Sequence, residues 1–468
     1  MNASDGAPAP PRGWTGSARR IVPLAWPVFV GQLAVLAFST VDTLLVARYA
    51  AARGSADDLA ALAVGAAAYI TVFIGMMGLV LAVGPIAGQL FGARRHAEAG
   101  EQLHQAVWLA LGGTLLGGAA LAFPQPFLAV AQAGPEVAAK VRGYTLGLAA
   151  ALPAALLFTA YRGFNIAVSR PKAVMALQLA GLALKLPLSV ALVFGAGPVP
   201  ALGVVGCGIA TAVAMWAQVL VAWVVLRRDR FYVPFALWGR GLHPPSRVAL
   251  GALLRLGVPM GLATLIEVTG FSFMALFISR LGTTPVAGHQ IAVNLMALLF
   301  MMPLSVAQAA STLVAQRIGA GDIGDARRLG WHGLQLGIGV AALMGTAVFA
   351  LREPIVRVYS GDAAVVAAAL PLLRWAALFH VADAAQIIAA FVLRAWRVAT
   401  LPLAIYVVSL WGVGLGGGYA LVTHGEALVP ASLRGASGYW AACTLGLVLA
   451  ASALSALLAA VLRRQRRR

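Results

Sequence analysis

A single carboxylate interrupts the most informative apolar stretch of the sequence, which runs from Leu254 to Arg280. Glu267 lies twelve residues after Arg255 (267 − 255 = 12) and thirteen before Arg280 (280 − 267 = 13). At about 1.5 Å per helical residue it is roughly 18 Å from either end, near the middle of a bilayer core about 30 Å thick. Because an ionisable group at that depth costs about 2.5–3.5 kcal/mol or more, we expect Glu267 to be functional.

Two further acids and one base lie within apolar segments. Asp42 is in STVDTLLVARYA, Asp383 is in FHVADAAQIIAAFVLRAW, and Lys185 is in LAGLALKLPLSVAL. Carboxylates buried in an apolar bundle can exchange a proton between the two sides of a membrane or hold Na⁺, as an ion-coupled carrier requires. The alternative is that these charges form structural ion pairs. His380, one turn before Asp383, is either a partner for its proton or a packed histidine.

Lys185 is too deep to reach the membrane surface. It lies thirteen residues after Lys172 (185 − 172 = 13), roughly 20 Å along a helix, whereas a lysine side chain extends only about 6 Å. The depths of Asp42 and Lys185 overlap within a turn or two. We therefore predict that Lys185 pairs with Asp42 and occupies the place of a bound cation.

The composition indicates a polytopic membrane protein. Of 468 residues, 61% are hydrophobic and 10% are charged, with a mean hydropathy of +0.88, whereas soluble domains carry about 25% charged residues. The net charge of +19 comes from residues in short loops and at the termini, so it reads as an orientation signal and not as a nucleic-acid surface. Cys207 and Cys443 lack metal or redox spacing and are expected to be buried small hydrophobic residues.

Twelve apolar segments have spanning length, and they predict an all-α bundle because a lipid-exposed backbone must satisfy its own hydrogen bonds. Lys and Arg are more frequent in the two tails and in the loops on the same side of the membrane than in the loops on the other side. Both termini are therefore predicted to be cytoplasmic. The segments lie near residues 21–47, 60–84, 103–123, 139–160, 172–194, 204–226, 250–279, 286–314, 329–350, 364–392, 398–421 and 437–462.

The two halves of the chain resemble each other. Pro27 in LAWPVFVGQL matches Pro259 in LGVPMGLATL (259 − 27 = 232), and Gln89 matches Gln316 (316 − 89 = 227). A duplication of six helices predicts two lobes related by a pseudo-two-fold axis along the membrane normal, with a substrate cleft near the midplane. The predicted parts are a disordered cytoplasmic tail at 1–20, an N-lobe at 21–226, a linker at 227–247, a C-lobe at 248–462 and a basic tail at 463–468.

Several of these stretches together resemble the MATE (multidrug and toxic compound extrusion) transporters, specifically the NorM-like branch. They are the VDTLLVARYA run after a Pro-containing first helix, the Glu267 stretch, VAGHQIAVNLMALLFMMPLSVAQAASTLVAQRIGAGD, and DAAQIIAAFVLRAW. The resemblance implies a V-shaped pair of six-helix lobes, alternating access, and export of organic cations driven by entry of Na⁺ or H⁺. It implies a helix bend at Pro27.

The resemblance also assigns site residues. Carboxylates matching Glu267 and Asp383 form the cation site of the C-lobe, a possible Na⁺ site, and one matching Asp42 acts in the N-lobe. Gln290 and Asn294 match polar positions that either support the site or form ordinary interhelical hydrogen bonds. The chain departs from the family where LKLPLS replaces an LNIPLN-like stretch and where Arg48 replaces the signature Gly, so a family-type cation site in the N-lobe is in doubt.

Other classes of protein fit less well. An enzyme would need a nucleophile–base set, a metal cluster or a phosphate loop, and a channel would need a ring of repeated polar groups; neither pattern is present. No ATP-binding motif or cofactor motif is found. The alternative is a flippase for lipid-linked oligosaccharides, but its pyrophosphate site predicts several deep basic residues, and only Lys185 is deep. We expect a monomeric, multi-pass protein of the bacterial inner membrane that binds cationic or amphipathic drugs and dyes and no nucleic acid.

Overall fold

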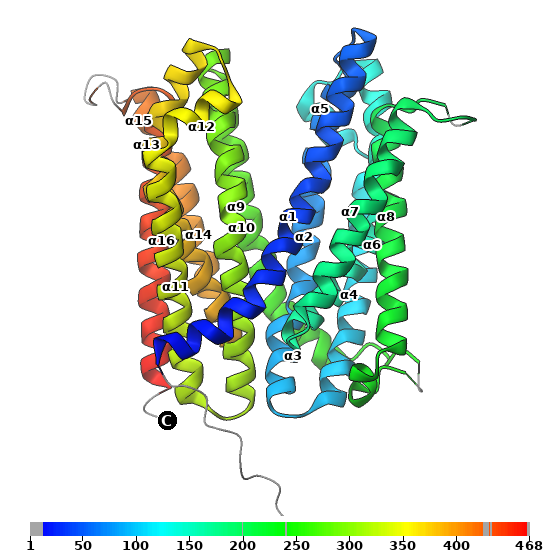
Figure 1. Cartoon of the computed structure of the whole chain (residues 1–468), viewed down its shortest axis with the longest axis vertical. Coiled ribbons are helices and arrows are strands. Elements are labelled where there is room, and N and C mark those ends of the chain that lie inside the picture. Colours follow the sequence, from blue (N-terminus) through cyan, green and yellow to red (C-terminus); the bar gives the residue numbers. More distant parts are fainter. Residues whose placement is uncertain (1–12, 199, 239–240, 425–429, 431–432, 466–468) are drawn as a thin grey trace, which may run out of the picture. The chain divides into compact units, whose positions relative to one another are not determined.

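The computed structural model describes residues 13–198, 200–238, 241–424, 430 and 433–465, and almost all of them are helical (Figure 1). Within these residues, twelve helices or runs of helices are long and apolar enough to cross a membrane, one for each apolar segment, so the all-α prediction is confirmed. The elements are α1 (Trp14–Arg53), α2 (Asp57–Leu81), α3 (Val83–Gly92), α4 (His96–Ala122), α5 (Gln125–Ala131), α6 (Pro135–Ala167), α7 (Pro171–Phe194), α8 (Val204–Arg228), η1 (Arg230–Phe235), α9 (Arg247–Ser279), α10 (Thr283–Gly319), α11 (Ile323–Ala350), α12 (Arg352–Tyr359), α13 (Ala363–Ala395), α14 (Thr400–Tyr406), η2 (Val407–Gly416), α15 (Gly417–His424) and α16 (Ala436–Arg464).

Packing divides the chain into two units whose boundaries fall inside helices. Unit 2 is Val30–Thr269, and unit 1 combines the described residues through Phe29 with those from Gly270 onward. Helices α1 and α9 therefore each begin in one unit and end in the other. The sequence predicts a different division, in which the halves 21–226 and 248–462 are separated by the linker. Pro27 lies just before the boundary in α1, where its missing N–H removes one helical hydrogen bond and favours a bend.

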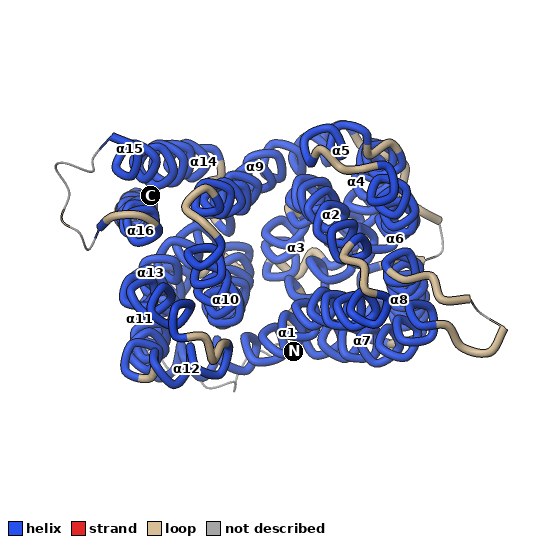
Figure 2. Tube along the Cα trace, turned by 90° about the horizontal axis from the view of Figure 1, so that it is seen from above, coloured by secondary structure: helices blue, strands red, loops and turns tan. Residues whose placement is uncertain are grey.

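The same helix order recurs in both units, as the duplication predicts. In unit 2, α6 packs against α8, α2 and α4; in unit 1, α13 packs against α16, α10 and α11, which are the matching helices of the second half. A short helix follows the third span of each half, α5 after α4 and α12 after α11. Figure 2 shows the helices of each unit nearly end-on.

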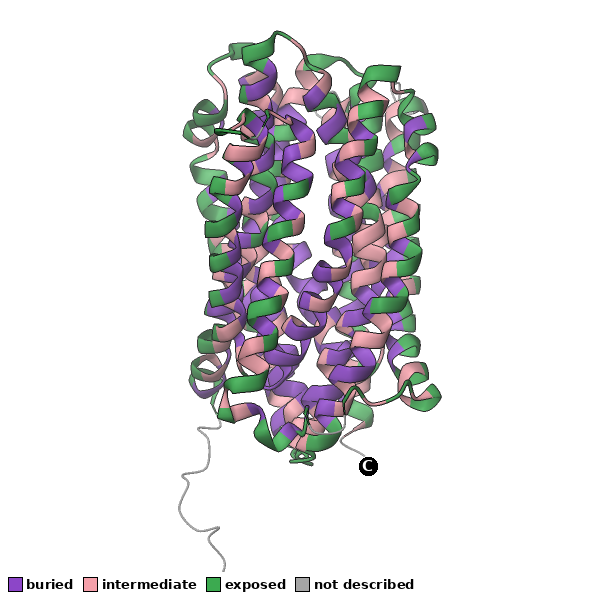
Figure 3. Ribbon diagram, turned by 90° about the vertical axis from the view of Figure 1, so that its right-hand side faces the viewer, coloured by how far each residue is buried: buried purple, intermediate pink, exposed green. Residues whose placement is uncertain are grey.

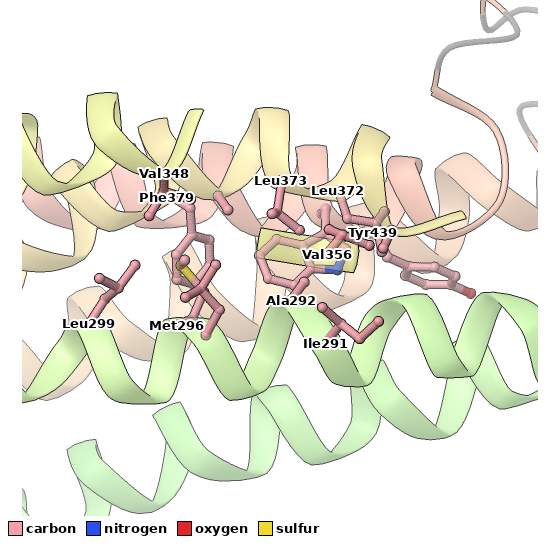
Figure 4. Packing of buried hydrophobic residues seen from close by; sticks show 14 of the residues in the cluster. Ile291, Ala292, Met296, Leu299, Val348, Val356, Leu372, Leu373, Phe379 and Tyr439 are labelled. Atoms are coloured by element: carbon pink, nitrogen blue, oxygen red, sulfur yellow. The ribbon is translucent and has the colours of Figure 1, made fainter. Parts of the chain in front are cut away.

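Apolar side chains form the interior of the units and much of their surface. Buried residues follow the inner faces of the helices and exposed residues follow the outer faces (Figure 3). In unit 1, Phe379, Leu372 and Leu373 of α13 pack against Met296 and Ile291 of α10 (Figure 4). Exposed leucines on the outer faces are expected where lipid replaces water. They include Leu115, Leu116, Leu220 and Leu343.

Polar contacts attach the first turns of α1 to unit 1. The Arg20 guanidinium lies 2.8 Å from the buried Asp325 carboxylate, which also pairs with Arg317 at 3.1 Å. Ser17 Oγ and His332 Nδ1 are 2.7 Å apart. Asp322 caps α11 by accepting a hydrogen bond from the Asp325 N–H at 2.9 Å, which fixes that carboxylate at the helix start.

The residues directly before α9 are attached to unit 2 in the corresponding way. The Ser246 N–H donates to Gln105 Oε1 at 2.9 Å, and Gln105 Nε2 donates to the Pro244 carbonyl at 2.9 Å. Gln105 and His332 are related by the offset of the two glutamines in the sequence (332 − 105 = 227). The two halves thus use matching positions to hold the helix that enters from the other half of the repeat.

The predicted linker includes a folded segment that packs on unit 2. Tyr232 and Phe235 of η1 are buried, and the Tyr232 hydroxyl donates to Asn165 Oδ1 of α6. Arg170 pairs with Asp229 and stacks over the Phe231 ring, 4.4 Å from its centroid. Burial raises the pKa of Tyr232, so its hydroxyl stays protonated and able to donate.

Candidate functional site

Asp42 and Lys185 form an ion pair inside unit 2. Lys185 Nζ of α7 lies 2.8 Å from Asp42 Oδ2 of α1, and the side chains are 2% and 9% exposed. The contact that the residue depths predict is therefore present in the structure.

The ammonium of Lys185 is fully surrounded. Besides Asp42 it donates to the Phe38 carbonyl at 3.0 Å, and it lies 4.6 Å from the centroid of the Phe38 ring. Phe38 is one turn before Asp42, so both acceptors and the ring come from one face of α1. An ammonium has three donors, and here two meet oxygen atoms while the aromatic face stabilises the charge.

The carboxylate of Asp42 is less completely bonded than its partner. Within the described residues, Asp42 Oδ1 is buried and makes no conventional hydrogen bond, and the further donor beside the carboxylate is the weak Cys207 thiol of α8. The Ser189 hydroxyl, one turn after Lys185 on the same face of α7, is likewise buried and has no hydrogen-bond partner among the described residues. The two helices that carry the ion pair thus each hold a buried polar oxygen with spare hydrogen-bonding capacity.

Asp383 lies at the end of a directed chain of hydrogen bonds in unit 1. Gln386 Nε2 donates to Asp383 Oδ1 at 2.9 Å, and the Tyr406 hydroxyl donates to Gln386 Oε1. All three side chains are buried, and Tyr406 comes from α14, directly before the wide π-helical turns of η2. Each bond polarises the next toward the carboxylate, which stabilises its negative charge.

His380 is buried one turn before Asp383 on α13. Its Nε2 has no hydrogen-bond partner among the described residues. The Gln386 amide donates to Asp383. A shared proton between His380 and Asp383 stays a prediction.

Gln290 and Asn294 lie one turn apart on α10 and are both exposed. Their neighbours His289 and Leu295 are buried, and His289 accepts a hydrogen bond from Trp440 at 3.2 Å. The two amides therefore lie on the face of α10 that points away from the core of unit 1. Polar side chains on such a face are typical of helices that line a water-filled cavity.

Glu267 is half-buried on α9, near the end of the part of that helix that belongs to unit 2. Asp383 belongs to unit 1. The cation site that the resemblance assigns to these two carboxylates has its residues in different units, and it stays a prediction.

The sequence analysis does not identify two residues of the hydrogen-bond chain that leads to Asp383. Gln386 had a signal, because it follows Asp383 by three residues and so shares its helix face. Tyr406 had none, since it belongs to another helix and lies in an apolar run. Phe38 likewise had a signal, one turn before Asp42, but an aromatic residue in an apolar helix is ordinary.

Comparison with known proteins gives full-length similarity to one family. The MatE family model matches residues 27–191 and 259–420, which repeats the two-half division of the sequence. A probable multidrug resistance protein NorM of Aromatoleum aromaticum is 39% identical over 447 residues, which is 96% of this chain and 95% of that protein. Multidrug resistance protein PmpM of Pseudomonas aeruginosa is 35% identical, with 95% of this chain and 92% of that protein covered.

Solved structures share the fold at lower identity. The Vibrio cholerae MATE transporter VcmN in its bent form has a TM-score of 0.82 at 19% identity, covering 96% of this chain and 98% of that one. The eukaryotic MATE transporter AtDTX14 has a TM-score of 0.84 at 18% identity, covering 95% and 96%. With the family model matched in both halves and the twelve spans in place, the chain is a multi-pass membrane protein of the MATE transporter family, in its NorM-like branch.

Proposed function

We propose that this protein is a secondary active multidrug exporter, which moves organic cations out of the cell in exchange for H⁺ or Na⁺ by alternating access. Its relatives are named as multidrug resistance proteins. We place it in the bacterial inner membrane as a monomer with cytoplasmic termini, with the lipid bilayer and amphipathic cations as its partners. It would need no cofactor and carry out no chemical conversion.

The observation that carries the proposal is the burial of acids within spanning helices. Asp42 and Asp383 are both less than a tenth exposed, on helices that are otherwise apolar over spanning length. Since each buried charge costs about 2.5–3.5 kcal/mol or more, a purely structural role would be served at lower cost by apolar residues. Carboxylates are the groups that exchange a proton or bind a monovalent cation.

The two acids differ in what they offer to a cation. Asp383 accepts from a neutral amide that is itself held by a phenol, an arrangement suited to holding a negative charge ready for H⁺ or Na⁺. Asp42 already has a cation from its own chain. We therefore assign ion coupling to Asp383 with Glu267, supported by Gln290 and Asn294, and cation recognition to Asp42.

The substrate is expected to be positively charged. Acids outnumber bases at the buried positions named here, so an anionic pyrophosphate headgroup would meet repulsion, whereas an organic cation would be attracted. Exchange of one proton for one monovalent cation is electroneutral. A pH gradient of one unit then supplies about 1.4 kcal/mol, enough for about tenfold accumulation.

Ethidium transport into proteoliposomes tests the proposal. The purified chain is reconstituted, and a pH gradient or a Na⁺ gradient is imposed separately, with the Glu267→Gln/Asp383→Asn variant as the matched control. Ethidium movement driven by at least one gradient in the wild type, and by neither in the control, is expected. Transport of anionic dyes with ethidium ignored would overturn the proposal and favour the flippase.

A further inference from the structure

Lys185 is the feature of the site that the family resemblance does not supply. We propose that its ammonium is a tethered cation for Asp42, which a transported organic cation or a proton replaces during transport, and which keeps Na⁺ out of this pocket. The inference rests on the proposed function for its transport step. Its structural part, the exchange of one cation for another at Asp42, can be tested without transport.

The contacts of Lys185 are those of a bound cation. The ammonium lies 2.8 Å from a carboxylate oxygen, 3.0 Å from a backbone carbonyl oxygen and 4.6 Å from an aromatic centroid. A small organic cation in an acidic, aromatic pocket would make contacts of the same kind. Because the lysine is covalently attached, it occupies this place without any cost of association.

The surroundings supply no competing charge of either sign. Val46, one turn after Asp42, packs with Tyr144 of α6, Cys207 of α8 and Tyr69 of α2, which are neutral at neutral pH. The charged residues Asp58 of α2 and Lys140 of α6 pair with each other at 2.6 Å. Within the described residues, Lys185 is the one ion-pair partner of Asp42, so the neutrality of the pocket depends on this pair.

One oxygen atom of the Asp42 carboxylate is not used by Lys185. Asp42 Oδ1 makes no conventional hydrogen bond among the described residues, since its further neighbouring donor is the weak Cys207 thiol. A proton that adds to Oδ1 forms an O–H bond and removes the carboxylate charge, which ends the attraction for the ammonium. An organic cation that approaches Oδ1 competes for the same charge. In both cases the pocket then holds one cation too many, and Lys185 must move away.

The same reasoning excludes Na⁺. A metal ion bound to Asp42 would lie within a few ångströms of the Lys185 ammonium, and like charges at that distance in an apolar interior repel strongly. An organic cation meets the same repulsion, but the burial of its apolar body offsets it, and a proton neutralises the carboxylate by forming an O–H bond; Na⁺ does neither. Any Na⁺ bound by the protein should therefore belong to Glu267 and Asp383.

A double-mutant cycle tests the pair by thermal stability of the purified full chain. We compare Asp42→Asn, Lys185→Met and the double variant. Each single variant leaves one buried charge without its counter-charge, so each should melt well below the wild type, whereas the double variant should recover most of the loss. If a single variant fails to fold and the double variant folds, that outcome also shows recovery of stability in the double variant.

The matched control is the exposed pair of Arg357 and Glu353, at 2.8 Å with side chains 65% and 57% exposed. Its cycle should show almost no coupling. Additive effects of Asp42→Asn and Lys185→Met, equal to those of the exposed pair, would overturn the inference. This readout involves no transport, so its failure is distinct from a failure of the proposed function.

Na⁺ binding provides the second arm. In a Glu267→Gln/Asp383→Asn background, which removes the proposed coupling site, equilibrium binding of radioactive Na⁺ should be absent. Adding Lys185→Asn, which restores the neutral residue of the family, should create Na⁺ binding that Asp42→Asn then abolishes. Na⁺ binding in the background with Lys185 intact, lost on Asp42→Asn, would overturn the inference. Ethidium binding in the same background should become about tenfold tighter with Lys185→Met, since its competitor is gone.

Discussion

Asp42 and Asp383, one buried acid from each unit, have different partners. In unit 2 the Asp42 carboxylate meets a full positive charge at 2.8 Å. In unit 1 Asp383 accepts from the Gln386 amide, which is held in turn by the Tyr406 hydroxyl. The first contact pairs the acid with a full opposite charge, and the second gives the acid a neutral hydrogen-bond donor. The difference teaches that one duplicated framework can surround its buried acids with partners of different chemistry.

The comparison extends to the position that matches Asp42 in the second half. The offset of the two prolines places Met274 there (42 + 232 = 274). Met274 is fully buried, and its sulfur lies 3.3 Å from the Cys443 thiol of α16. A polarisable apolar side chain thus fills the place that a charge occupies in unit 2. The two units share the same order of helices, but at this position unit 2 has a charged side chain and unit 1 has an apolar one.

The largest expected effect concerns the acids assigned to ion coupling. Asp383→Asn and Glu267→Gln should each reduce gradient-driven ethidium transport to the leak rate of protein-free liposomes, because an amide cannot take up a proton or hold a monovalent cation tightly. Folded protein should remain, as judged by a monodisperse gel-filtration profile. Glu353→Gln, an exposed acid of α12, is the matched control and should transport normally. Wild-type rates in both variants would end the assignment.

The second largest effect is expected on stability, from substitutions of Met274, the position that matches Asp42. Met274→Asp places a carboxylate in unit 1 without a lysine to pair with it, so the chain should be destabilised by about 3 kcal/mol or more. Met274→Leu, similar in volume, should cost less than about 1.5 kcal/mol. Melting temperatures of the two purified variants measure the difference. Equal stability of the two would show that charge at this position is tolerated without a partner.

A smaller effect is expected from the hydrogen-bond chain. Tyr406→Phe removes the hydroxyl that holds Gln386, and a buried hydrogen bond contributes about 0.5–1.5 kcal/mol. Ion-coupled transport should slow by up to about tenfold, with the Na⁺ or H⁺ concentration for half-maximal rate raised, because the carboxylate is less well held. Tyr419→Phe, on α15, is the control and should leave both parameters unchanged. A rate change without a shift in ion dependence would contradict the role of the chain at Asp383.

The smallest expected effect tests how much burial contributes to the stabilisation by an ion pair. Arg357→Gln breaks an ion pair of the same length as that of Lys185 and Asp42, but on the surface. Exposed pairs contribute about 0–1 kcal/mol, so the melting temperature and the transport rate should barely change. Stability is measured in the same detergent and at two salt concentrations. A loss comparable to that of Lys185→Met would mean that ion-pair length and not depth sets the effect.

Much of the fold follows from the sequence because lipid imposes simple rules. The twelve spans are predicted by length and hydropathy, and the pairing of Asp42 with Lys185 is predicted because two deep opposite charges must find each other. The unit boundaries at Phe29 and Thr269 are not predicted. A long apolar helix carries no sign of where its packing partner changes, even when Pro27 marks a place for it to bend.

The polar chain shows where the sequence falls short. An intramembrane acid stands out against an apolar background, whereas a tyrosine or a glutamine in a spanning helix does not. Tyr406 contacts Gln386 because of the position of α14. That position depends on many apolar contacts, none of which can be recognised in the sequence. The packed η1 segment was also missed, since a basic, Pro-containing stretch such as Arg227–Arg247 has the composition of a loop.

The distance along the chain between ion-pair partners determines when they can first meet during synthesis. Lys185 follows Asp42 by 143 residues, and Asp325 follows Arg20 by 305 residues. At a synthesis rate of about 5–20 residues per second, Asp42 waits about 7–29 s for its lysine, and Arg20 waits about 15–61 s for its aspartate. Helix α1 thus leaves the ribosome before the other described spans, and its ion pairs form only after Lys185 and Asp325 have followed. The nascent chain must hold an acid in or near the membrane through several rounds of helix insertion before its own cation arrives.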